Sequence, residues 1–300
     1  MEPFFARRIA VSSEDTQLIF SSSLVRIEKV CCLRARRGLS CEECKTEHQI
    51  GVPLSGVNVR HVGGEQFAIT PSHITLSNRG EEYRVSHPHG SGETQLTITV
   101  RENLLLELLG KQGASAADRA QPFAERQLPI AAKSRLALQL LMTAAKSQSH
   151  TALELEEAIV AVIARLLSVA RTTETQTISS REGQLAQAAR SLLATRFTDP
   201  ISLEEIAATL GVSVYHLCRV YRRVLGATLW SEIKQLRSRE ALVRLAEGES
   251  DLTALGLALG FSHHSHFTAS FRQSVGLTPS HARRLLATGT LAEVRTLLAN

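Results

Sequence analysis

One pattern of apolar residues around a glycine occurs twice near the carboxyl end of this 300-residue chain, and it restricts the possible folds more than any other feature. The first copy begins at Ser202, and the second follows about 50 residues later. Gly211 matches Gly260 at an offset of 49, whereas Leu217 matches Phe267 at an offset of 50, so the second turn carries one extra residue. Two copies in register are not expected of an arbitrary helical bundle, and they predict a pair of helix-turn-helix units.

Each position of the first copy has a mechanical role in such a unit. Ser202 is expected to cap the first helix, with Glu205 three residues later completing a capping box. Gly211 suits the left-handed conformation that turns the chain. Ser213 is expected to cap the second helix. The inward face of that second helix is predicted to consist of Leu217, Val220 and Tyr221.

Between the two copies, residues 229–246 have the pattern of one long helix. At about 1.5 Å per residue it would be roughly 27 Å long. Successive major-groove faces on one side of B-DNA lie roughly 34 Å apart, so a rigid connector of this size can place two recognition helices on one face of the duplex. The charge agrees with this reading, because 14 Lys and Arg against 10 Asp and Glu follow residue 178, out of a total net charge of +5.

Residues 200–284 resemble the DNA-binding domain of the AraC/XylS family of bacterial transcriptional regulators. The family signature is plainest in the second copy, in Gly260-Phe261-Ser262, His266-Phe267, Phe271-Arg272 and Gly276-Leu277-Thr278-Pro279-Ser280. The resemblance implies double-stranded DNA and RNA polymerase as partners, and activation rather than repression of transcription. It also implies an amino-terminal cupin-like β domain that binds a small-molecule effector. We expect no cofactor.

Carried over by position, the resemblance implies base contacts from both recognition helices. Arg219 can pair bidentately with guanine, and Tyr215 can contact a thymine methyl group or a backbone oxygen. In the second unit the position of Ala269 is often arginine in the family, so we expect the first unit to read most of the bases. The complete set of candidates is Val214, Tyr215, Cys218, Arg219, His264, Ser265 and Thr268.

Basic side chains of the same region are candidates for phosphate contacts, which provide affinity and salt dependence without sequence information. The alternative is ordinary solvated surface charge, and we expect about half of the set to contact DNA, foremost Arg223 and Arg272. Trp230 and Phe271 are expected in the core rather than stacked on bases. The phosphate candidates are Arg222, Arg223, Lys234, Arg237, Arg239 and Arg272.

The rest of the chain predicts an α+β multidomain protein. Residues 1–110 show short alternating strands separated by glycine-rich turns, typical of an antiparallel sandwich or small barrel whose interior could hold a ligand. The subsequent boundaries are a linker at 111–127, a helical hairpin at 128–171 that either covers the barrel or forms a homodimer, a linker at 172–178, the DNA-binding domain at 179–290 and a tail at 291–300.

Two groups of side chains have spacings seen in metal sites. His87, His89 and Glu93 match the His-x-His-x-x-x-Glu spacing of some cupins, although Pro88 interrupts the strand that would present them. Cys41 and Cys44 have zinc-ligand spacing. For the first group, the alternative that we favour is a polar turn at the barrel mouth. For the second group, we favour a pair of free thiols.

Several function classes are not supported by the sequence. The amino terminus has no secretory-signal pattern, and the most apolar stretch, 158–170, is shorter than the roughly 20 residues that span a bilayer, so we expect a cytoplasmic protein. No phosphate-binding loop or nucleophile elbow occurs, and we expect no enzyme activity. The alternative is a cupin-type metalloenzyme fused to a DNA-binding domain, suggested by His87, His89 and Glu93.

Overall fold

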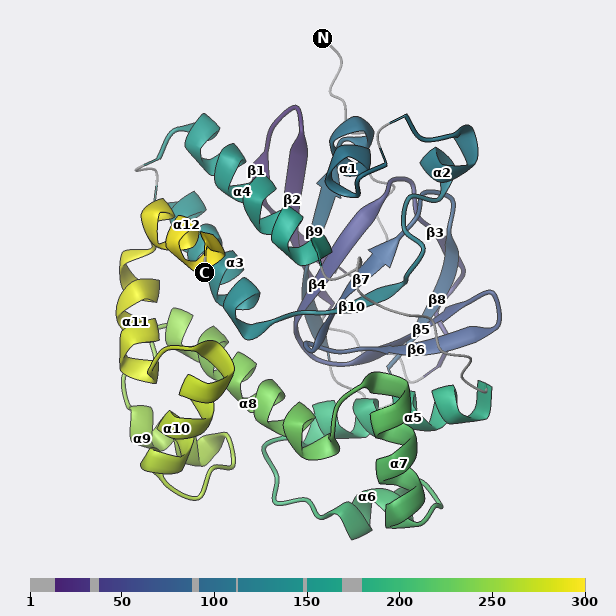
Figure 1. Ribbon diagram of the computed structural model, residues 1–300, viewed down its shortest axis with the longest axis vertical. Helices are drawn as coiled ribbons and strands as arrows, with labels where there is room; N and C mark the ends of the chain where they lie inside the picture. The colour runs from purple at the N-terminus through teal and green to yellow at the C-terminus, as the bar shows by residue number, and fades with distance from the viewer. Residues whose placement is uncertain are drawn as a thin grey trace.

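The computed structural model describes residues 14–32, 38–87, 92–111, 113–147, 150–168 and 180–299. Figure 1 shows a β domain, a helical hairpin beside it and a helical carboxyl-terminal part that extends from below the β domain to the outer side of the hairpin. The expected α+β organisation is confirmed. None of the helices in these ranges has both the length and the apolar character needed to cross a membrane.

The β domain consists of two antiparallel sheets. The larger has the order β1-β2-β9-β4-β7-β10, and the smaller has the order β3-β8-β5-β6. The antiparallel β domain predicted as a sandwich or small barrel is therefore confirmed. The strands are β1 (Glu14–Ser21), β2 (Val25–Cys32), β3 (Glu43–Cys44), β4 (Gln49–Ser55), β5 (Asn58–Val62), β6 (Glu65–Ile69), β7 (His73–Ser77), β8 (Glu82–Ser86), β9 (Glu93–Val100) and β10 (Gln127–Pro129).

The two faces of the larger sheet differ in polarity because successive side chains of a strand point to opposite sides. Ile50 and its register partner Ile98 lie on the apolar face, which belongs to the main hydrophobic core. Their neighbours Gln49 and Thr99 pair on the opposite face. Ser77 of that face accepts a 2.7 Å hydrogen bond from Nη1 of Arg60, on the smaller sheet. The space between the sheets is thus lined by polar groups on the side of the larger sheet.

The segment expected as a linker at 111–127 is part of the β domain. It contains a short helix, and its last residue begins β10, which pairs with β7. Phe123 is buried, and it exchanges two hydrogen bonds with the Asn78 side chain, at 2.9 Å and 3.1 Å. These non-local contacts hold the segment, and a pattern of Gly, Ala and Ser could not indicate them.

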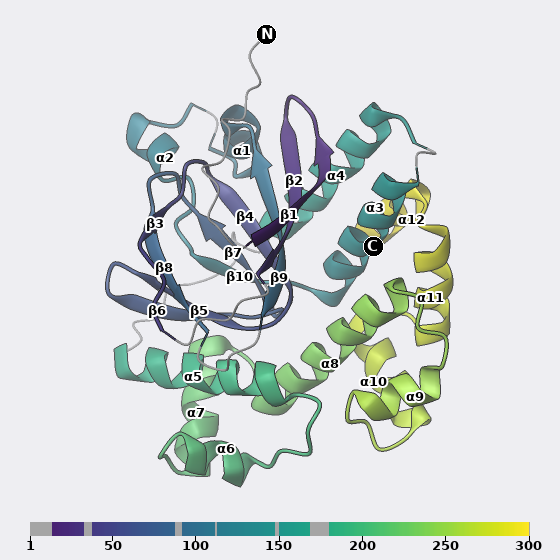
Figure 2. The ribbon, with the colours of Figure 1, turned by 180° about the vertical axis from the view of Figure 1, so that it is seen from behind.

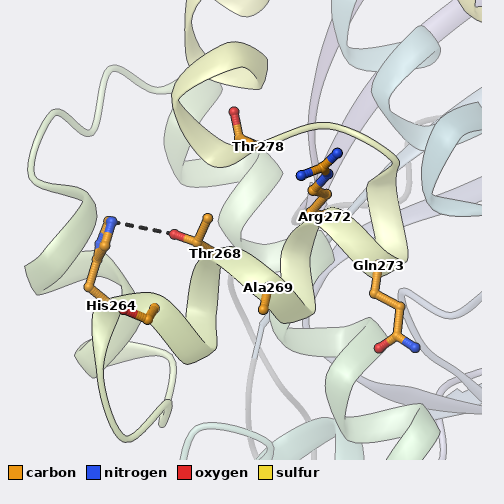
Figure 3. A pocket seen from close by; sticks show the side chains of 7 residues that line it. His264, Thr268, Ala269, Arg272, Gln273 and Thr278 are labelled. Atoms are coloured by element: carbon orange, nitrogen blue, oxygen red, sulfur yellow. Dashed lines mark hydrogen bonds between the residues drawn. The ribbon is translucent and has the colours of Figure 1, made fainter.

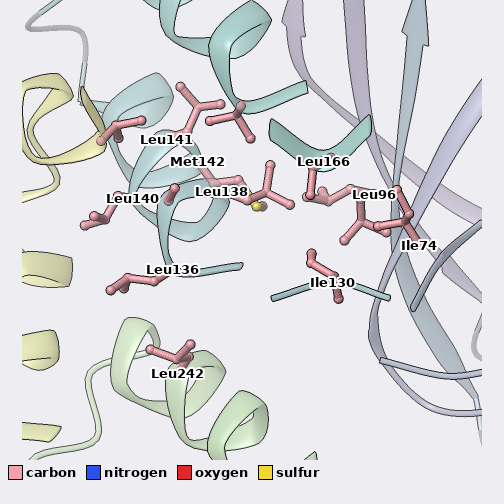
Figure 4. Packing of buried hydrophobic residues seen from close by; sticks show 14 of the residues in the cluster. Ile74, Leu96, Ile130, Leu136, Leu138, Leu140, Leu141, Met142, Leu166 and Leu242 are labelled. Carbon is pink, nitrogen blue, oxygen red and sulfur yellow. The ribbon is translucent and has the colours of Figure 1, made fainter. Parts of the chain in front are cut away.

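The two predicted hairpin helices cover the apolar face of the larger sheet. They are α3 (Ala132–Lys146) and α4 (Ala152–Leu167), the latter with a complete capping box between Thr151 and Glu154. Figure 4 shows Leu166 of α4 beside Ile74 and Leu96 of the sheet. Of the two roles considered for the hairpin, covering the β domain is the one that the structure displays.

The expected carboxyl-terminal tail is instead a helix, α12 (Leu291–Ala299), that packs against α3 and α4. Leu291 and Val294 are buried in the core shared with the hairpin. Arg295 adds an ion pair with Glu157 of α4 at 2.7 Å. Because α12 and the sheet together bury the hairpin residues of the shared core, those residues are not available to a second subunit, whereas Leu153 of α4 is 75% exposed.

The carboxyl-terminal part is docked on the rest of the chain (Figures 1 and 2). Its first helix lies against β6, and its long central helix contacts α3. The segment predicted as the 172–178 linker lies outside the described residues. The remaining helices are α1 (Glu102–Leu108), α2 (Ala116–Ala120), α5 (Ser180–Arg196), α6 (Leu203–Thr209), α7 (Val214–Leu225), α8 (Leu229–Ala246), α9 (Leu252–Ala258), α10 (His264–Val275) and α11 (Pro279–Thr288).

The docking of α5 depends on polar contacts with the β domain. Arg190 of α5 is 1% exposed, and its Nη2 donates to the Ala68 carbonyl at 2.8 Å and to Gln127 Oε1 at 2.5 Å. Gln187 Oε1 accepts from the Ala68 amide at 3.2 Å. Nη1 of Arg190 lies 3.1 Å from Nδ1 of His73, which can accept a hydrogen bond only while the imidazole is neutral.

Acidification below about pH 6.5 is expected to weaken this docking. Burial, followed by the charges of Arg190 and Arg239, lowers the pKa of His73 well below its ordinary value of 6.5. Below pH 6.5 the His73 imidazole is protonated in the unfolded chain but stays neutral in the folded chain. The stability associated with neutral His73 is therefore complete above pH 6.5 and is lost progressively as the pH falls below it. Urea midpoints at pH 7.5 and 5.5 measure the loss, which should be smaller in His73→Gln. An equal loss in both proteins would contradict the role of His73.

Candidate nucleic-acid interface

The first helix-turn-helix unit consists of α6 and α7, and its local structure follows the sequence as expected. Ser202 accepts a 3.1 Å hydrogen bond from the Glu205 amide, and Glu205 completes the capping box. Gly211 turns the chain at φ +68°, and Ser213 caps α7 by accepting from the His216 amide at 3.2 Å. The predicted inward residues of α7 are all buried, namely Leu217, Val220 and Tyr221.

The second unit consists of α9 and α10, and its turn is longer by the predicted residue. Four residues separate α6 from α7, whereas five separate α9 from α10. The extra residue places His263 at the cap of α10, where its side chain accepts from the His266 amide at 3.1 Å. Gly260 is confined by packing, since a Cβ there would lie 2.4 Å from the Thr198 carbonyl oxygen. Phe271 is fully buried, as predicted.

The connector between the units is α8, an 18-residue helix of about 27 Å. In both views the two units lie at opposite ends of α8, in the lower part of the molecule, below the β domain and the hairpin (Figures 1 and 2). Both recognition helices are thus held on one side of the molecule by one rigid element.

The four base-contact candidates of the first unit differ in exposure. Tyr215 is 79% exposed, and Arg219 is also exposed, with its Nη2 3.5 Å from Nδ1 of His216. Val214 and Cys218 are half-buried and pack against the core of the unit. Tyr215 and Arg219 are therefore free to meet a base edge, whereas the other two are partly engaged in packing.

The candidates of the second unit gather on one concave surface of α10 (Figure 3). His264 and Ser265 are exposed, and Thr268 is half-buried, with its Oγ1 3.3 Å from Nε2 of His264. Ala269 presents only a methyl group at the centre of this surface. The rest of the lining consists of Arg272, Gln273 and Thr278.

The phosphate candidates divide into a surface group and a buried pair. Arg222, Arg223 and Arg272 are exposed, and Lys234 is half-buried. Arg223 forms an ion pair with Glu182 of α5, so a phosphate would have to compete with that carboxylate.

The expectation for Arg237 and Arg239 is wrong, because both side chains lie inside the protein, at 5% and 2% exposure. Arg237 donates from Nε to the Phe197 carbonyl at 2.6 Å and from Nη1 to the Gly260 carbonyl at 2.7 Å. It thereby ties the second turn to the end of α5. Helical spacing placed both arginines correctly on α8 but could not show which faces of that helix the other elements cover.

Two helix N-termini beside the recognition helices were not anticipated. Thr228 caps α8 and Thr278 caps α11, each accepting from the backbone amide three residues later, at 3.1 Å and 3.3 Å. The partial positive charge of a helix N-terminus favours phosphate oxygens. The Gly-x-Thr spacing at Gly226 and Gly276 was the available signal. Trp230 in the first turn of α8 is 51% exposed, so its expected place in the core was wrong.

The metal candidates of the β domain do not assemble within the described residues. Nε2 of His87 lies 3.8 Å from Oε2 of Glu93, while His89 lies outside the described ranges. Cys41 and Cys44 are exposed free thiols. Over the described part of the chain, no three His, Cys, Asp or Glu side chains come together as a metal-ion group would require.

Comparisons with known proteins identify both halves of the chain. A helix-turn-helix domain model matches residues 206–285, and an AraC-like ligand binding domain model matches residues 29–163. The structure is also similar to that of ToxT from Vibrio cholerae O395, with 12% identity and a TM-score of 0.36 over 88% of this chain and 99% of that chain. A similarity at this level supports no functional conclusion.

Curated relatives match the carboxyl-terminal region. The probable transcription factor PqrA of Proteus vulgaris is 31% identical over 83 residues, which are 28% of this chain and 68% of that protein. The invasion protein InvF of Salmonella typhi is 33% identical over 69 residues, 23% of this chain and 32% of that protein. The chain spans about a third of the length of InvF and of the Bacillus subtilis regulator YdeC, which is 28% identical over 89 residues. With both domain models matched and PqrA covered over two thirds of its length, the chain belongs to the AraC/XylS family of bacterial transcriptional regulators.

Proposed function

We propose that this protein is an effector-responsive transcriptional activator that binds operator DNA through both helix-turn-helix units. The supporting observation is the position of α7 and α10 at opposite ends of α8, both in the lower part of the molecule, below the β domain and the hairpin. The roughly 27 Å of α8, together with the breadth of the units themselves, is compatible with two successive major-groove faces about 34 Å apart.

In this proposal the two units divide the work unequally. Tyr215 and Arg219 read bases, assisted by Val214 and Cys218 where those side chains emerge from the core of the first unit. In the second unit Ala269 offers no hydrogen bond, so α10 mainly positions the protein, with smaller contributions from His264, Ser265 and Thr268. Phosphate contacts come from Arg222, Arg223, Lys234 and Arg272, supplemented by the N-termini of α8 and α11.

The β domain is the proposed receiver of a small-molecule effector. Its support is the match to an AraC-like ligand binding domain and the polar lining between the sheets, where Gln49, Ser77 and Thr99 share one register row. Helix α5 contacts β6, and α8 contacts α3. A ligand that binds one docking arrangement better than another therefore shifts the position of both helix-turn-helix units.

Further partners follow from the role of an activator. We propose RNA polymerase as the protein that it recruits, and the cytoplasm as the place where it meets chromosomal DNA. A homodimer would use the outward face of the hairpin, where Ala161 and Arg165 of α4 are exposed. We propose no catalytic activity, although one relative, AdaA of Bacillus subtilis, is named a bifunctional transcriptional activator and DNA repair enzyme, at 27% identity over 42% of that protein.

Genome-wide mapping of sites bound by the full chain, followed by binding of the purified protein to one mapped site, tests the proposal. The expected footprint covers two segments about one helical turn apart on one face of the duplex. A protein that binds all sequences equally, or that protects only one segment, would contradict two-unit recognition. The genes beside the mapped sites would also indicate the effector.

Arg272→Ala is expected to weaken binding to all DNA sequences by a similar factor. Arg272 is exposed on the α10 surface, and we assign it a contact with a DNA phosphate. Its loss therefore lowers the affinity for DNA without changing the preference for base sequence. The slope of log affinity against log salt concentration should fall by about 1. Fluorescence anisotropy with operator and random duplexes, between about 50 and 200 mM salt, measures both quantities. A loss confined to the operator would assign Arg272 to a base instead.

A further inference from the structure

A group of buried charges lies where the β domain, the hairpin and the DNA-binding part meet. Three arginines from three helices, Arg135 of α3, Arg190 of α5 and Arg239 of α8, are only 1–2% exposed. Glu232 of α8 is 4% exposed, and it accepts a hydrogen bond from the Ser72 hydroxyl of the β domain. The term "junction cluster" denotes Arg135, Arg190, Arg239, Glu232 and the neighbouring Tyr221 and His73.

Carbonyl oxygens of the β domain and of the segment after it hold the three guanidinium groups. Nη2 of Arg135 donates to the Pro53 and Pro71 carbonyls at 2.9 Å and 2.7 Å. Nη2 of Arg239 donates to the Ile130 carbonyl at 2.8 Å. The arginines thus connect helices of all parts of the chain, but each carbonyl supplies a dipole and not a full negative charge.

The charges of the junction cluster do not balance. The Glu232 carboxylate acts on Arg190 and Arg239, whereas the charge that acts on Arg135 is the like charge of Arg239. Burial lowers the pKa of Arg135 to about 9 and that of Arg239 to about 10. Both remain protonated at neutral pH, and with His73 neutral, three guanidinium groups and one carboxylate leave two positive charges without a counter-charge in the cluster.

The cluster also holds hydrogen-bond donors that no described residue accepts from. They are Nε and Nη1 of Arg135, Nε and Nη1 of Arg239, Nε of Arg190 and the hydroxyl of Tyr221, all buried. Buried polar groups are normally hydrogen-bonded, and a buried charge left without a partner costs several kcal/mol of folding free energy. A bound anion would neutralise the excess positive charge and would also accept hydrogen bonds from these unused donors.

We propose that the junction cluster binds a small anion carrying one or two negative charges, a carboxylate or a phosphate group, between Arg135 and Arg239. Guanidinium groups pair with both kinds of oxyanion through charge-assisted hydrogen bonds. The site rests on the proposed function in one respect, since the anion would serve as an effector.

The position of the cluster gives such an anion a direct route to the DNA-binding surface. Tyr221 comes from α7, the first recognition helix, and it is fully buried beside Arg190 and Glu232. Arg239 and Glu232 belong to α8, which carries both units. An anion that draws Arg135 and Arg239 together therefore stabilises one placement of α8 on the hairpin, and it changes DNA affinity to the extent that it prefers that placement.

Thermal unfolding and calorimetric titration of the full chain test the site. The probes are sodium phosphate and sodium succinate, each compared with sodium chloride at equal ionic strength. At saturation either probe is expected to raise Tm by about 3 °C or more above the chloride value, with one anion bound per chain. The stronger of the two identifies phosphate or carboxylate as the preferred group. Equal Tm values in phosphate, succinate and chloride would overturn the proposal.

Variants establish where the anion binds. Arg135→Gln and, independently, Arg239→Gln should lower the anion affinity at least about 10-fold, because each removes one of the two positive charges assigned to the anion. Arg84→Gln is the matched control, since Arg84 is exposed, pairs with Glu42 and forms no hydrogen bond or ion pair with the junction cluster in the described part of the chain, so it should leave the affinity unchanged. If neither cluster variant folds, the site is tested on the unaltered chain, whose affinity for operator DNA should change when succinate is bound.

The outcomes separate this site from the proposed function. An unchanged anion affinity in Arg135→Gln or Arg239→Gln, or an unchanged operator affinity in saturating succinate and phosphate, overturns the anion site. Operator binding itself is measured without added anion, so its failure would count against the DNA-binding proposal and not against the site.

Discussion

Glu232→Gln is expected to lower the free energy of unfolding by about 3 to 5 kcal/mol. The carboxylate is buried on α8, and it is the negative charge that acts on Arg190 and Arg239. The amide preserves shape and can still bond to Ser72, but it leaves the buried guanidinium groups without a counter-charge. Removing a negative charge that acts on buried cations is costly for this reason, because the cations stay buried with their charges uncompensated. Urea unfolding followed by circular dichroism measures the change.

Glu240→Gln is the matched control on the same helix. Glu240 forms an ion pair with Arg244 at 3.0 Å, one turn away, and the arginine is 37% exposed, so water screens the charge that remains. The expected change is within about 0.5 kcal/mol. Similar losses in the two variants would mean that the charge of Glu232 is not what joins α8 to the β domain.

Arg219→Ala is expected to reduce affinity for a mapped operator by about 10- to 100-fold, equivalent to about 1 to 3 kcal/mol, and to relax the preference at one base pair. The guanidinium is exposed on α7, with a 3.5 Å contact to His216 and no ion pair among the described residues to compete for it. Binding to random DNA should fall much less, because the lost contact is assigned to a base. Anisotropy titrations on the operator, on single-base variants and on random duplexes measure the difference.

Ala269→Ser is the matched control in the second unit, at the position of α10 equivalent to Arg219. A small polar side chain on the exposed surface should change operator affinity by less than about 2-fold, since no base contact is assigned to Ala269. Equal losses in Arg219→Ala and Ala269→Ser would contradict the unequal division of base reading between the two units.

Local signals predicted the helix-turn-helix units almost completely. The capping box at Ser202, the left-handed Gly211 and the cap at Ser213 are decided by residues within one turn of each other. The extra residue in the second turn could be counted directly. The antiparallel strands and the hairpin helices follow from periods of two and 3.6, which a short window reveals.

Features that depend on contacts between distant segments could not be predicted in this way. The segment at 111–127 resembles a linker in composition, yet β10 completes a sheet through pairing with β7. Residues 291–299 form a helix because the hairpin covers Leu291 and Val294. Trp230 is apolar but lies on the exposed side of the first turn of α8.

Sequence alone therefore determined the kind of elements, the repeat and the family, because caps, turns and periodic faces act over a few residues. Only the tertiary structure decided which faces are covered. It moved Arg237 and Arg239 from the expected DNA-binding surface into the interior, and it brought Arg239 close to Arg135, more than 100 residues away. The junction cluster could not be predicted from the sequence, because its side chains become buried and their charges unbalanced only when separate elements pack together.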